Sequence, residues 1–282
     1  MSPAIAPATT VGPVHLTVAD LDRSLRWYAD ALGLERAPDG HGDGTALRAG
    51  GDELLVLYEE PGARPVAHHT GLYHYALLVP TRSDLARWLA HVAQEHVPLT
   101  GLSDHIVSEA VYLRDPDGHG IEIYRDRPRD QWVHDGDEVR MSTDQVDVED
   151  LLGAAEGEPT GVPVGTRMGH VHLHVADIPA AEAFYRDVLG FDETAHLGDQ
   201  ASFFSAGGYH HHVGVNTWAG PGASPPPPGS AALRHATIVL PDTAERDRVA
   251  DRAADAGAEP AAVADGIHIH DPSENALVLT AA

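Results

Sequence analysis

The strongest constraint on the fold of this chain is that the chain repeats itself. The segment VHLTVADLDRSLRWYADALGLE begins at Val14, and the related segment VHLHVADIPAAEAFYRDVLGFD begins at Val171, an offset of 157 residues. A second related pair, DPDGHGIEIY from Asp115 and DPSENALVLT from Asp271, has an offset of 156 residues. Self-similarity on this scale indicates that one structural unit occurs more than once.

The repeat divides the chain into two homologous halves. We predict an N-terminal domain over residues 8–126 and a C-terminal domain over 165–282, which suits a chain of 282 residues. Residues 127–164 are polar, acidic and rich in Gly and Pro, which is typical of a linker. Within this linker, VEDLLGAA predicts one short helical turn.

Each half divides again into two modules. Residues 12–18 alternate in the manner of a strand, and Asp20 is a plausible helix N-cap. Apolar residues then follow at helical spacing: Leu21, Leu25, Tyr28 and Leu32. Gly33 stands where a C-cap glycine belongs, and two short strands come after it. The pattern restarts at GLYHYALLVP and twice more in the second half, so we predict four β-α-β-β-β modules and an α+β fold.

Composition and charge exclude several functions. A net charge of −25 argues against binding to nucleic acid, which needs a basic surface, and against docking on anionic membranes. The chain has no apolar run of about 18 residues, so we expect no membrane span. There is no cysteine, which excludes disulfides and thiolate metal sites and favours a cytoplasmic location.

Three segments, together with the modules, carry a resemblance to a known family. They are GLYHYALLVP, DHIVSEAVYLRDPDGHGIEIYRDRPRDQW and SAGGYHHHVGVNTW. With them the chain resembles the vicinal oxygen chelate superfamily, which includes glyoxalase I, the bleomycin-resistance proteins and the type I extradiol ring-cleaving dioxygenases. It is most similar to the two-domain, catechol 2,3-dioxygenase-like group. The resemblance implies that two modules pack side by side and curl around a cleft that often holds a divalent metal.

The resemblance also implies a metal site in the first half. His15, His74 and Glu122 match the metal triad of the extradiol enzymes in order and approximate spacing. Two imidazoles and one carboxylate form the ligand set of non-haem Fe(II), and Mn(II) or Zn(II) can also occupy it. A carboxylate on an apolar strand is costly unless it is paired or metal-bound. Taken singly, each residue could equally be an ordinary strand histidine or a solvent-facing glutamate.

The second half lacks the carboxylate. His172 and His235 fall on its two equivalent first strands, but Val278 stands where the first half has Glu122. Two neutral imidazoles alone compensate the charge of a dication poorly. We therefore expect the metal in the N-terminal domain only, and the second half could be a lid, a regulatory domain or a dimer surface.

Two further residues are candidates for the chemistry of the first half. The family has a tyrosine ten residues before the ligand glutamate that contacts a catecholate oxygen, and Tyr112 stands at this place. A phenol beside a dication can donate to a bound oxyanion. His105 precedes the same strand and is a candidate substrate-binding histidine. The alternative for Tyr112 is a core tyrosine.

One catalytic part is missing from the first half. The family uses a distal histidine on the last strand of the first module as its acid–base catalyst, but the equivalent stretch, DELLVLYEE, offers only Tyr58. In the second half, GGYHHHVGVNTW does carry histidines at that place, and His212 suits the role best. The catalytic set is therefore split between the halves: either the first half uses another acid, or the second half still holds a site. The three histidines could also be a surface feature.

The resemblance favours an extradiol dioxygenase of aromatic catabolism that acts on a catechol and O₂ with Fe(II). Two alternatives remain: another metalloenzyme of the superfamily, such as a glyoxalase-type isomerase or a thiol transferase, and a binding protein without catalysis that sequesters a small molecule or drug. Members of this fold often pair, so a homodimer is compatible with the sequence.

Overall fold

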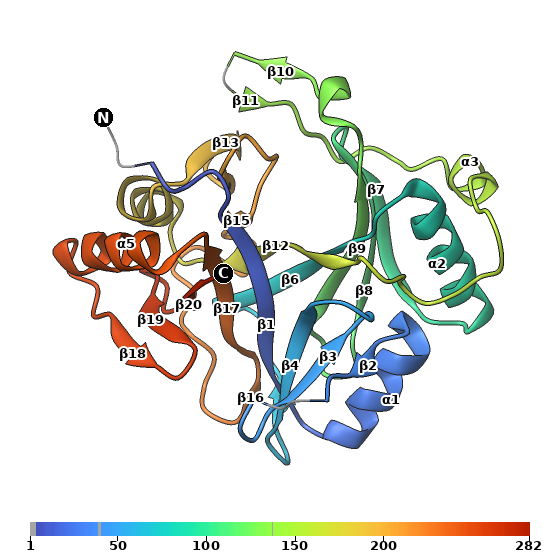
Figure 1. Cartoon of the computed structure of the whole chain (residues 1–282), viewed down its shortest axis with the longest axis horizontal. Helices are drawn as coiled ribbons and strands as arrows, with labels where there is room; N and C mark the ends of the chain where they lie inside the picture. Colours follow the sequence, from blue (N-terminus) through green and yellow to red (C-terminus); the bar gives the residue numbers. More distant parts are fainter. Residues whose placement is uncertain (1–3, 39–40, 137) are drawn as a thin grey trace.

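The computed structural model describes residues 4–38, 41–136 and 138–282 and contains two large, curled β-sheets (Figure 1). The four predicted modules are present, each a strand, a helix and three further strands, so the α+β prediction is confirmed. Module 1 consists of β1 (Thr10–Val18), α1 (Leu21–Leu32), β2 (Glu35–Arg36), β3 (Thr45–Arg48) and β4 (Glu53–Glu59). Module 2 consists of β6 (Gly71–Leu78), α2 (Arg82–Gln94), β7 (Leu99–Asp104), β8 (Ser108–Arg114) and β9 (Gly120–Asp126).

The second half repeats this order. Module 3 consists of β12 (Arg167–His174), α4 (Ile178–Glu182) continued by the π-helix η2 (Ala183–Leu189), β13 (Asp192–Leu197), β14 (Ala201–Ser205) and β15 (Val213–Asn216). Module 4 consists of β17 (Leu233–Leu240), α5 (Thr243–Asp255), β18 (Ala261–Val263), β19 (Gly266–His270) and β20 (Ala276–Ala281). The short elements between modules are β5 (Arg64–Pro65), η1 (Arg129–Gln131), β10 (His134–Asp135), β11 (Glu138–Val139), α3 (Val148–Gly153) and β16 (Ser230–Ala231).

The local signals in the sequence determine where the first helix begins and ends. The Asp20 carboxylate accepts a hydrogen bond from the Arg23 amide at 2.8 Å, as an N-cap residue does. Gly33 adopts φ 72° and ends α1 in the left-handed conformation that favours glycine. The longest helices, α2 and α5, have 13 residues, and none of the described helices is long and apolar enough to cross a membrane.

The sheets do not follow the two halves of the sequence. Modules 2 and 3 form one sheet in the order β13-β14-β15-β12-β6-β9-β8-β7, and modules 1 and 4 form the other in the order β18-β19-β20-β17-β1-β4-β3-β2. Antiparallel pairing of β6 with β12 joins the halves of the first sheet, and pairing of β1 with β17 joins those of the second. Each concave face is thus built from one module of each half.

The repeated Asp-Pro turns tie neighbouring modules together. The Asp115 carboxylate accepts from the backbone amides of Asp117 and His119, and Tyr28 of module 1 donates its hydroxyl to Asp115 at 2.9 Å. Asp271 of module 4 repeats this arrangement with Tyr185 of module 3 at 3.0 Å. The turns therefore have a structural role in both halves, independent of any ligand.

The segment between the halves is ordered against the first sheet. Its predicted helical turn is present as α3. Asp104 at the end of β7 exchanges two backbone hydrogen bonds of 2.9 Å with Asp144, and this contact holds residues 141–144 beside the β7–β8 turn. The segment therefore covers part of the concave face formed by modules 2 and 3.

Candidate metal centre

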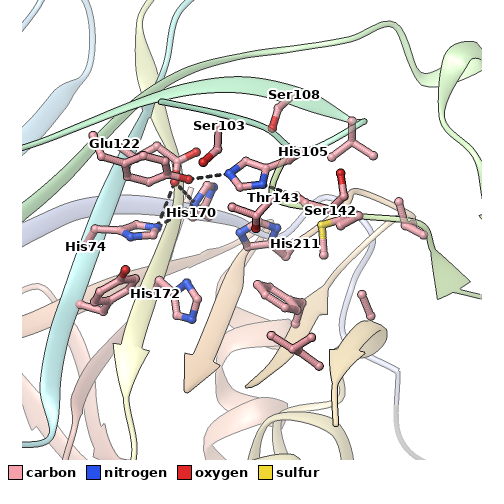
Figure 2. A pocket seen from close by; sticks show the side chains of 18 of the residues that line it. His74, Ser103, His105, Ser108, Glu122, Ser142, Thr143, His170, His172 and His211 are labelled. Atoms are coloured by element: carbon pink, nitrogen blue, oxygen red, sulfur yellow. Dashed lines mark hydrogen bonds and ion pairs between the residues drawn. The ribbon is translucent and has the colours of Figure 1, made fainter. Parts of the chain in front are cut away.

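Three buried side chains converge on the concave face of the sheet formed by modules 2 and 3. His74 comes from β6, Glu122 from β9 and His170 from β12 (Figure 2). Glu122 Oε2 lies 3.0 Å from His74 Nε2 and 3.3 Å from His170 Nε2, and the two ring nitrogens are 3.4 Å apart. Among the described residues these three form a group whose ligand atoms could share one ion.

The spacing of these donor atoms fits a bound cation. Ligand atoms held about 2.0–2.2 Å from one ion, at angles between 90° and 110°, are roughly 2.8–3.6 Å from each other. All three measured separations fall in this range. Moreover, two imidazole nitrogens point at each other and at the same carboxylate oxygen. A cation between them satisfies all three atoms, and two imidazoles with one carboxylate form an iron-type donor set.

The charges of the group also suit metal binding. Burial alone raises the pKa of Glu122, but the interactions with His170 and His74 outweigh it and hold the pKa well below the usual value. Burial lowers the pKa of His170 to about 4, although Glu122 opposes the shift. At neutral pH the site therefore presents an ionised carboxylate and, at His170, a neutral imidazole with a free lone pair.

His15 is not part of this group, which corrects the predicted triad. It lies on β1 in the other sheet, where its ring stacks on His235 with centroids 3.8 Å apart and its Nδ1 lies 3.1 Å from Tyr58 Oη. The physical reason is the pairing of modules: module 1 joins module 4, so His15 and His74 face different sheets. The structure instead brings His170 to the partners His74 and Glu122.

The sequence held a signal for His170. In HVHLHV, alternate residues of a strand share a face, so His170, His172 and His174 all point the same way. Between the two halves, His172 corresponds to His15, whereas His170 corresponds to Pro13 and has no histidine counterpart. His170, which has no histidine counterpart in the first half, is therefore the residue that joins His74 and Glu122.

Tyr112 and His105 lie beside the three side chains. Tyr112 on β8 is paired in register with Glu122, and burial together with this carboxylate raises the pKa of the phenol well above its usual value. His105 Nδ1 lies 2.6 Å from the carbonyl oxygen of Ser142, which can only accept, so Nδ1 carries the proton. His105 Nε2 then accepts from the Tyr112 hydroxyl at 2.6 Å.

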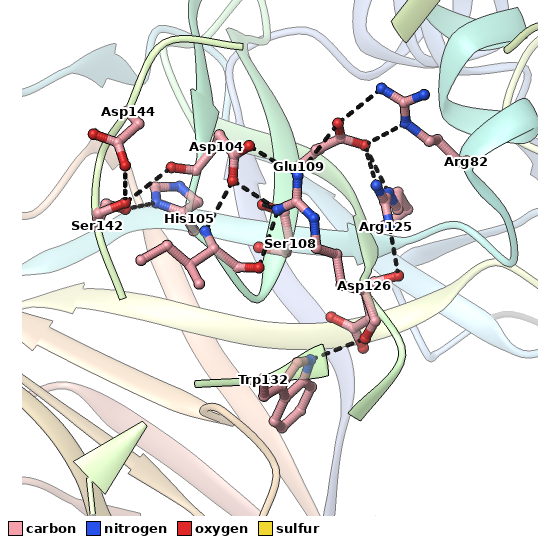
Figure 3. A network of polar contacts seen from close by, with 12 residues as sticks. Arg82, Asp104, His105, Ser108, Glu109, Arg125, Asp126, Trp132, Ser142 and Asp144 are labelled. Carbon is pink, nitrogen blue, oxygen red and sulfur yellow. Dashed lines mark hydrogen bonds and ion pairs between the residues drawn. The ribbon is translucent and has the colours of Figure 1, made fainter. Parts of the chain in front are cut away.

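An ion-pair network fixes the turn that carries His105 (Figure 3). Asp104 binds the Arg127 guanidinium through both oxygens, at 2.6 and 2.8 Å, and accepts from the Ile106 amide at 2.9 Å. Glu109 pairs with Arg82 and Arg125 on the same edge of the sheet. The turn and its histidine are therefore held by charged contacts on the side away from the cavity.

His211, rather than the predicted His212, lines the cavity that contains His74, Glu122 and His170. The Asp126 carboxylate lies 2.9 Å from His210 Nε2, and His210 Nδ1 lies 2.8 Å from His211 Nδ1. Because a carboxylate only accepts, neutral His210 carries its proton on Nε2 and accepts at Nδ1 from His211. His211 Nε2 is then left as an unprotonated acceptor, and burial lowers the pKa of this ring well below its usual value.

His212 faces the opposite side of the segment. Its Nδ1 accepts from the Ala206 amide at 3.1 Å, and its ring lines a second cavity. Neighbouring residues of an extended segment point to opposite faces, which explains why the prediction missed by one residue.

The first cavity has a volume of about 1110 Å³ and is large enough for a small aromatic molecule. Aromatic rings from modules 2 and 3 form its floor, with Tyr73, Phe203 and Trp218 around His172. The interdomain segment forms a further wall that includes Val139, Met141, Ser142 and Thr143. His172 Nε2 is buried without a hydrogen-bond partner among the described residues and is available to a polar ligand.

Comparison with known proteins agrees with these features. The model of the Glyoxalase/Bleomycin resistance protein/Dioxygenase superfamily matches residues 10–123 and 167–277. The chain belongs to this superfamily. It is 44% identical over 276 residues to a catechol-2,3-dioxygenase of Bacillus subtilis (strain 168), covering 96% of each chain.

Solved structures with a similar fold are more distant from this chain in sequence. A crystal structure of a candidate dioxygenase from Bacillus subtilis subsp. subtilis str. 168 has a TM-score of 0.67 at 16% identity, covering 99% of this chain and 86% of that one. Glyoxalase I from Zea mays has a TM-score of 0.58 at 16% identity, covering 96% and 92%. At this level of identity the likeness shows the fold alone.

Proposed function

We propose that this protein is an extradiol dioxygenase that opens the ring of a catechol with O₂, and that His74, Glu122 and His170 hold Fe(II). The observation that carries the proposal is the meeting, in one cavity, of this triad with Tyr112–His105 on one side and His211 on another. The 44% identity to a catechol-2,3-dioxygenase over nearly the whole chain supports it. The pairing of modules 2 and 3 also supports it, because residues from both halves of the sequence line one cavity.

The ion and its three protein ligands have different roles in the proposed reaction. When bound, a ferrous ion on two imidazoles and a carboxylate offers open coordination positions for the two oxygens of a catechol and for O₂. Glu122 neutralises part of the charge of the ion, and its ionised state at neutral pH follows from its lowered pKa. The three ligands come from adjacent strands, which holds their spacing rigidly.

Tyr112 and His105 receive and orient the diol. The Tyr112 phenol stays protonated at neutral pH because burial and Glu122 raise its pKa. It therefore acts as a hydrogen-bond donor, either to His105 Nε2 or to a catecholate oxygen placed over the triad. His105 Nε2 is unprotonated and can take up a proton that leaves the diol, while Nδ1 keeps its hydrogen bond to the Ser142 carbonyl.

His211 is the acid–base residue on the other side of the triad. Its ring lies 4.0 Å, between centroids, from His170, and its Nε2 is free to accept a proton. Asp126 and His210 fix this tautomer and hold the ring by contacts outside the cavity. The aromatic floor of Tyr73, Phe203 and Trp218 positions an apolar ring and excludes water from the reacting atoms.

Oxygen consumption tests the proposal. The protein is loaded with Fe(II) without air, mixed with a panel of catechols and exposed to O₂ while oxygen uptake and the absorbance of the ring-opened semialdehyde are recorded. Stoichiometric uptake that His211→Ala reduces without loss of iron would support the assignment. Full iron occupancy with no uptake for any catechol would reject ring cleavage, and an isomerase or transferase reaction on the same metal would then be tested.

A further inference from the structure

A second cavity lies on the opposite side of the segment that carries His211. It has a volume of about 380 Å³, and Tyr209 and His212 form part of its wall. The intervening His210 and His211 form the contacts with Asp126 and with the first cavity described above. Residues 209–212 therefore separate two cavities. The first cavity contains the His74–Glu122–His170 triad, and the second does not.

Two arginines, Arg129 and Arg167, line this second cavity. Arg129 lies over the rings of Trp132 and Tyr209, at 5.5 and 5.6 Å from their centroids, and donates one N–H to the Gly207 carbonyl. Its other N–H groups remain available, because a guanidinium has five. Arg167, at the start of β12, makes no ion pair with any residue that the structure describes.

Two uncharged groups complete the set of donors. His212 Nδ1 accepts from the Ala206 amide, so in the neutral ring Nε2 carries the proton and can donate. Thr9 is 1% exposed, and its Oγ1 is buried without a partner in the described part of the chain. A buried hydroxyl that lacks a partner is uncommon in native proteins and indicates a ligand or water at that place. Asp52, which is exposed, is the acidic residue in the wall.

We propose that this second cavity binds a small oxyanion, the carboxylate or phosphate group of a small molecule. The guanidinium groups of Arg129 and Arg167, which are exposed, line one cavity with His212 and with Thr9, whose hydroxyl is buried. Donors of these kinds bind planar and tetrahedral oxyanions. The concentration of positive groups stands out in a protein with a net charge of −25. The site is separate from the triad and does not depend on the proposed ring cleavage.

Calorimetric titration of the full chain with malonate and with inorganic phosphate, at fixed ionic strength, tests the site. Arg167→Gln is the main variant, because Arg167 has no intramolecular ion pair to lose. We expect saturable binding of one equivalent and a decrease in affinity of about tenfold in the variant, the usual effect of removing one charge-assisted hydrogen bond. A preference for malonate would identify a carboxylate as the natural group, and a preference for phosphate would identify a phosphate.

Two more variants make the result decisive. Thr9→Val removes the unpartnered hydroxyl without removing an intramolecular hydrogen bond, so it should weaken binding and leave the melting temperature unchanged or higher. Arg26→Gln changes the net charge equally at an exposed position of α1 and serves as the matched control. Equal weakening by Arg26→Gln and Arg167→Gln would show a general charge effect and overturn the proposal, and so would the absence of binding to the unmodified protein.

Discussion

The two eight-stranded sheets have the same architecture but differ at two of the positions that form the His74–Glu122–His170 group. Both carry a cross-strand pair of histidines in register, His74 with His172 in one sheet and His235 with His15 in the other. The positions that correspond in the repeats are His74 with His235, Glu122 with Val278, and His170 with Pro13. The histidine pair is thus common to both sheets, and the carboxylate and the extra imidazole distinguish the metal centre.

The difference shows what a pair of strand histidines does without a carboxylate. In the sheet of modules 1 and 4, burial and then unfavourable interactions with His235, His41 and Arg234 lower the pKa of His15 to about 3, and burial lowers the pKa of His235 to about 4. The two rings stack as neutral imidazoles at 3.8 Å. In the other sheet Glu122 brings a buried negative charge that needs a cation. A single substitution at Glu122 should therefore change a metal-binding histidine pair into one that binds no metal.

The largest effect is expected from Glu122→Val, which gives the sheet of modules 2 and 3 the residue that the other sheet has at this position. Removal of the one carboxylate leaves two neutral imidazoles and no charge to balance a dication. We expect metal affinity to fall by more than about 100-fold and oxygen uptake to be lost, measured by metal analysis and an oxygen electrode. Val278→Ala, at the corresponding position, should keep full metal content. A variant Glu122→Val that retained one equivalent of metal would refute the site.

Substitution of single histidines sharpens the comparison. His170→Ala should reduce metal affinity by about 100-fold, because one of three donors is lost, whereas His15→Ala should leave the metal content unchanged. Chelator competition measures both affinities. If His15→Ala released the metal and His170→Ala did not, the triad predicted from the sequence would be right and the pairing of the modules in solution would differ from the one described.

The sequence contained the modules and most of the site but not the way the modules pair. Strand and helix positions follow from apolar spacing and from caps such as Asp20 and Gly33, which are local signals. Pairing of modules depends on long-range contacts: the first strand of module 2 could pair with module 1 or with module 3, and both offer similar apolar strands. The repeat favoured the partner within one half, and this placed His15 with His74.

The errors in the site have the same origin. Glu122, His74, Tyr112 and His105 lie within module 2, so their mutual placement depends on one module alone, and the structure brings all four to one cavity. His170 and His211 come from module 3, and only the contact of β12 with β6 brings them there. The equivalent stretch of the first half offers no histidine, and module 3 brings His211 to the cavity. The resemblance predicts each module, but it does not predict which modules share a sheet.

The edge of the sheet of modules 2 and 3 is stabilised by a buried carboxylate, and the corresponding carboxylate of the other sheet is exposed. Glu109 on β8 is buried and pairs with Arg82 and Arg125, while the corresponding Asp265 is mostly exposed. Glu109→Gln leaves the half-buried Arg125 without its carboxylate partner, while Arg82 keeps its ion pair with Asp150. The substitution should lower the free energy of unfolding by about 3 kcal/mol at pH 7. Chemical denaturation measures the change, with Asp265→Asn as the control of little effect.

The same pair predicts a dependence on pH. Burial raises the pKa of Glu109, but hydrogen bonds from Arg82 and Arg125 outweigh it and lower the pKa below 4.5. A lowered carboxylate pKa stabilises the fold above about 4.5, and this stabilisation is lost as the pH falls through the lower, folded value. The difference between the unmodified protein and Glu109→Gln should therefore shrink below pH 4.5. A difference that is constant from pH 7 to pH 3 would show that ionisation of Glu109 contributes nothing.

The smallest expected effect tests the chain of contacts behind His211. The residue that corresponds to Asp126 in the other half is Ala282, and alanine has no carboxylate to make the contact with which Asp126 holds His210 and, through it, His211. Asp126→Asn offers His210 either an amide oxygen or an amide nitrogen and no longer enforces one tautomer. We expect kcat to fall by about 10-fold to 100-fold with metal content and KM little changed.

Tyr209→Phe separates this positioning role from simple packing. Tyr209 also donates to Asp126, at 3.0 Å, but its loss leaves the carboxylate and its hydrogen bond to His210 in place. The variant should keep most of the activity, while Asp126→Asn should also shift the pH profile of kcat, because the proton on His211 is no longer held at Nδ1. Equal losses in the two variants with an unchanged pH profile would mean that Asp126 only supports the packing around Tyr209, and that His211 obtains its orientation from the cavity itself.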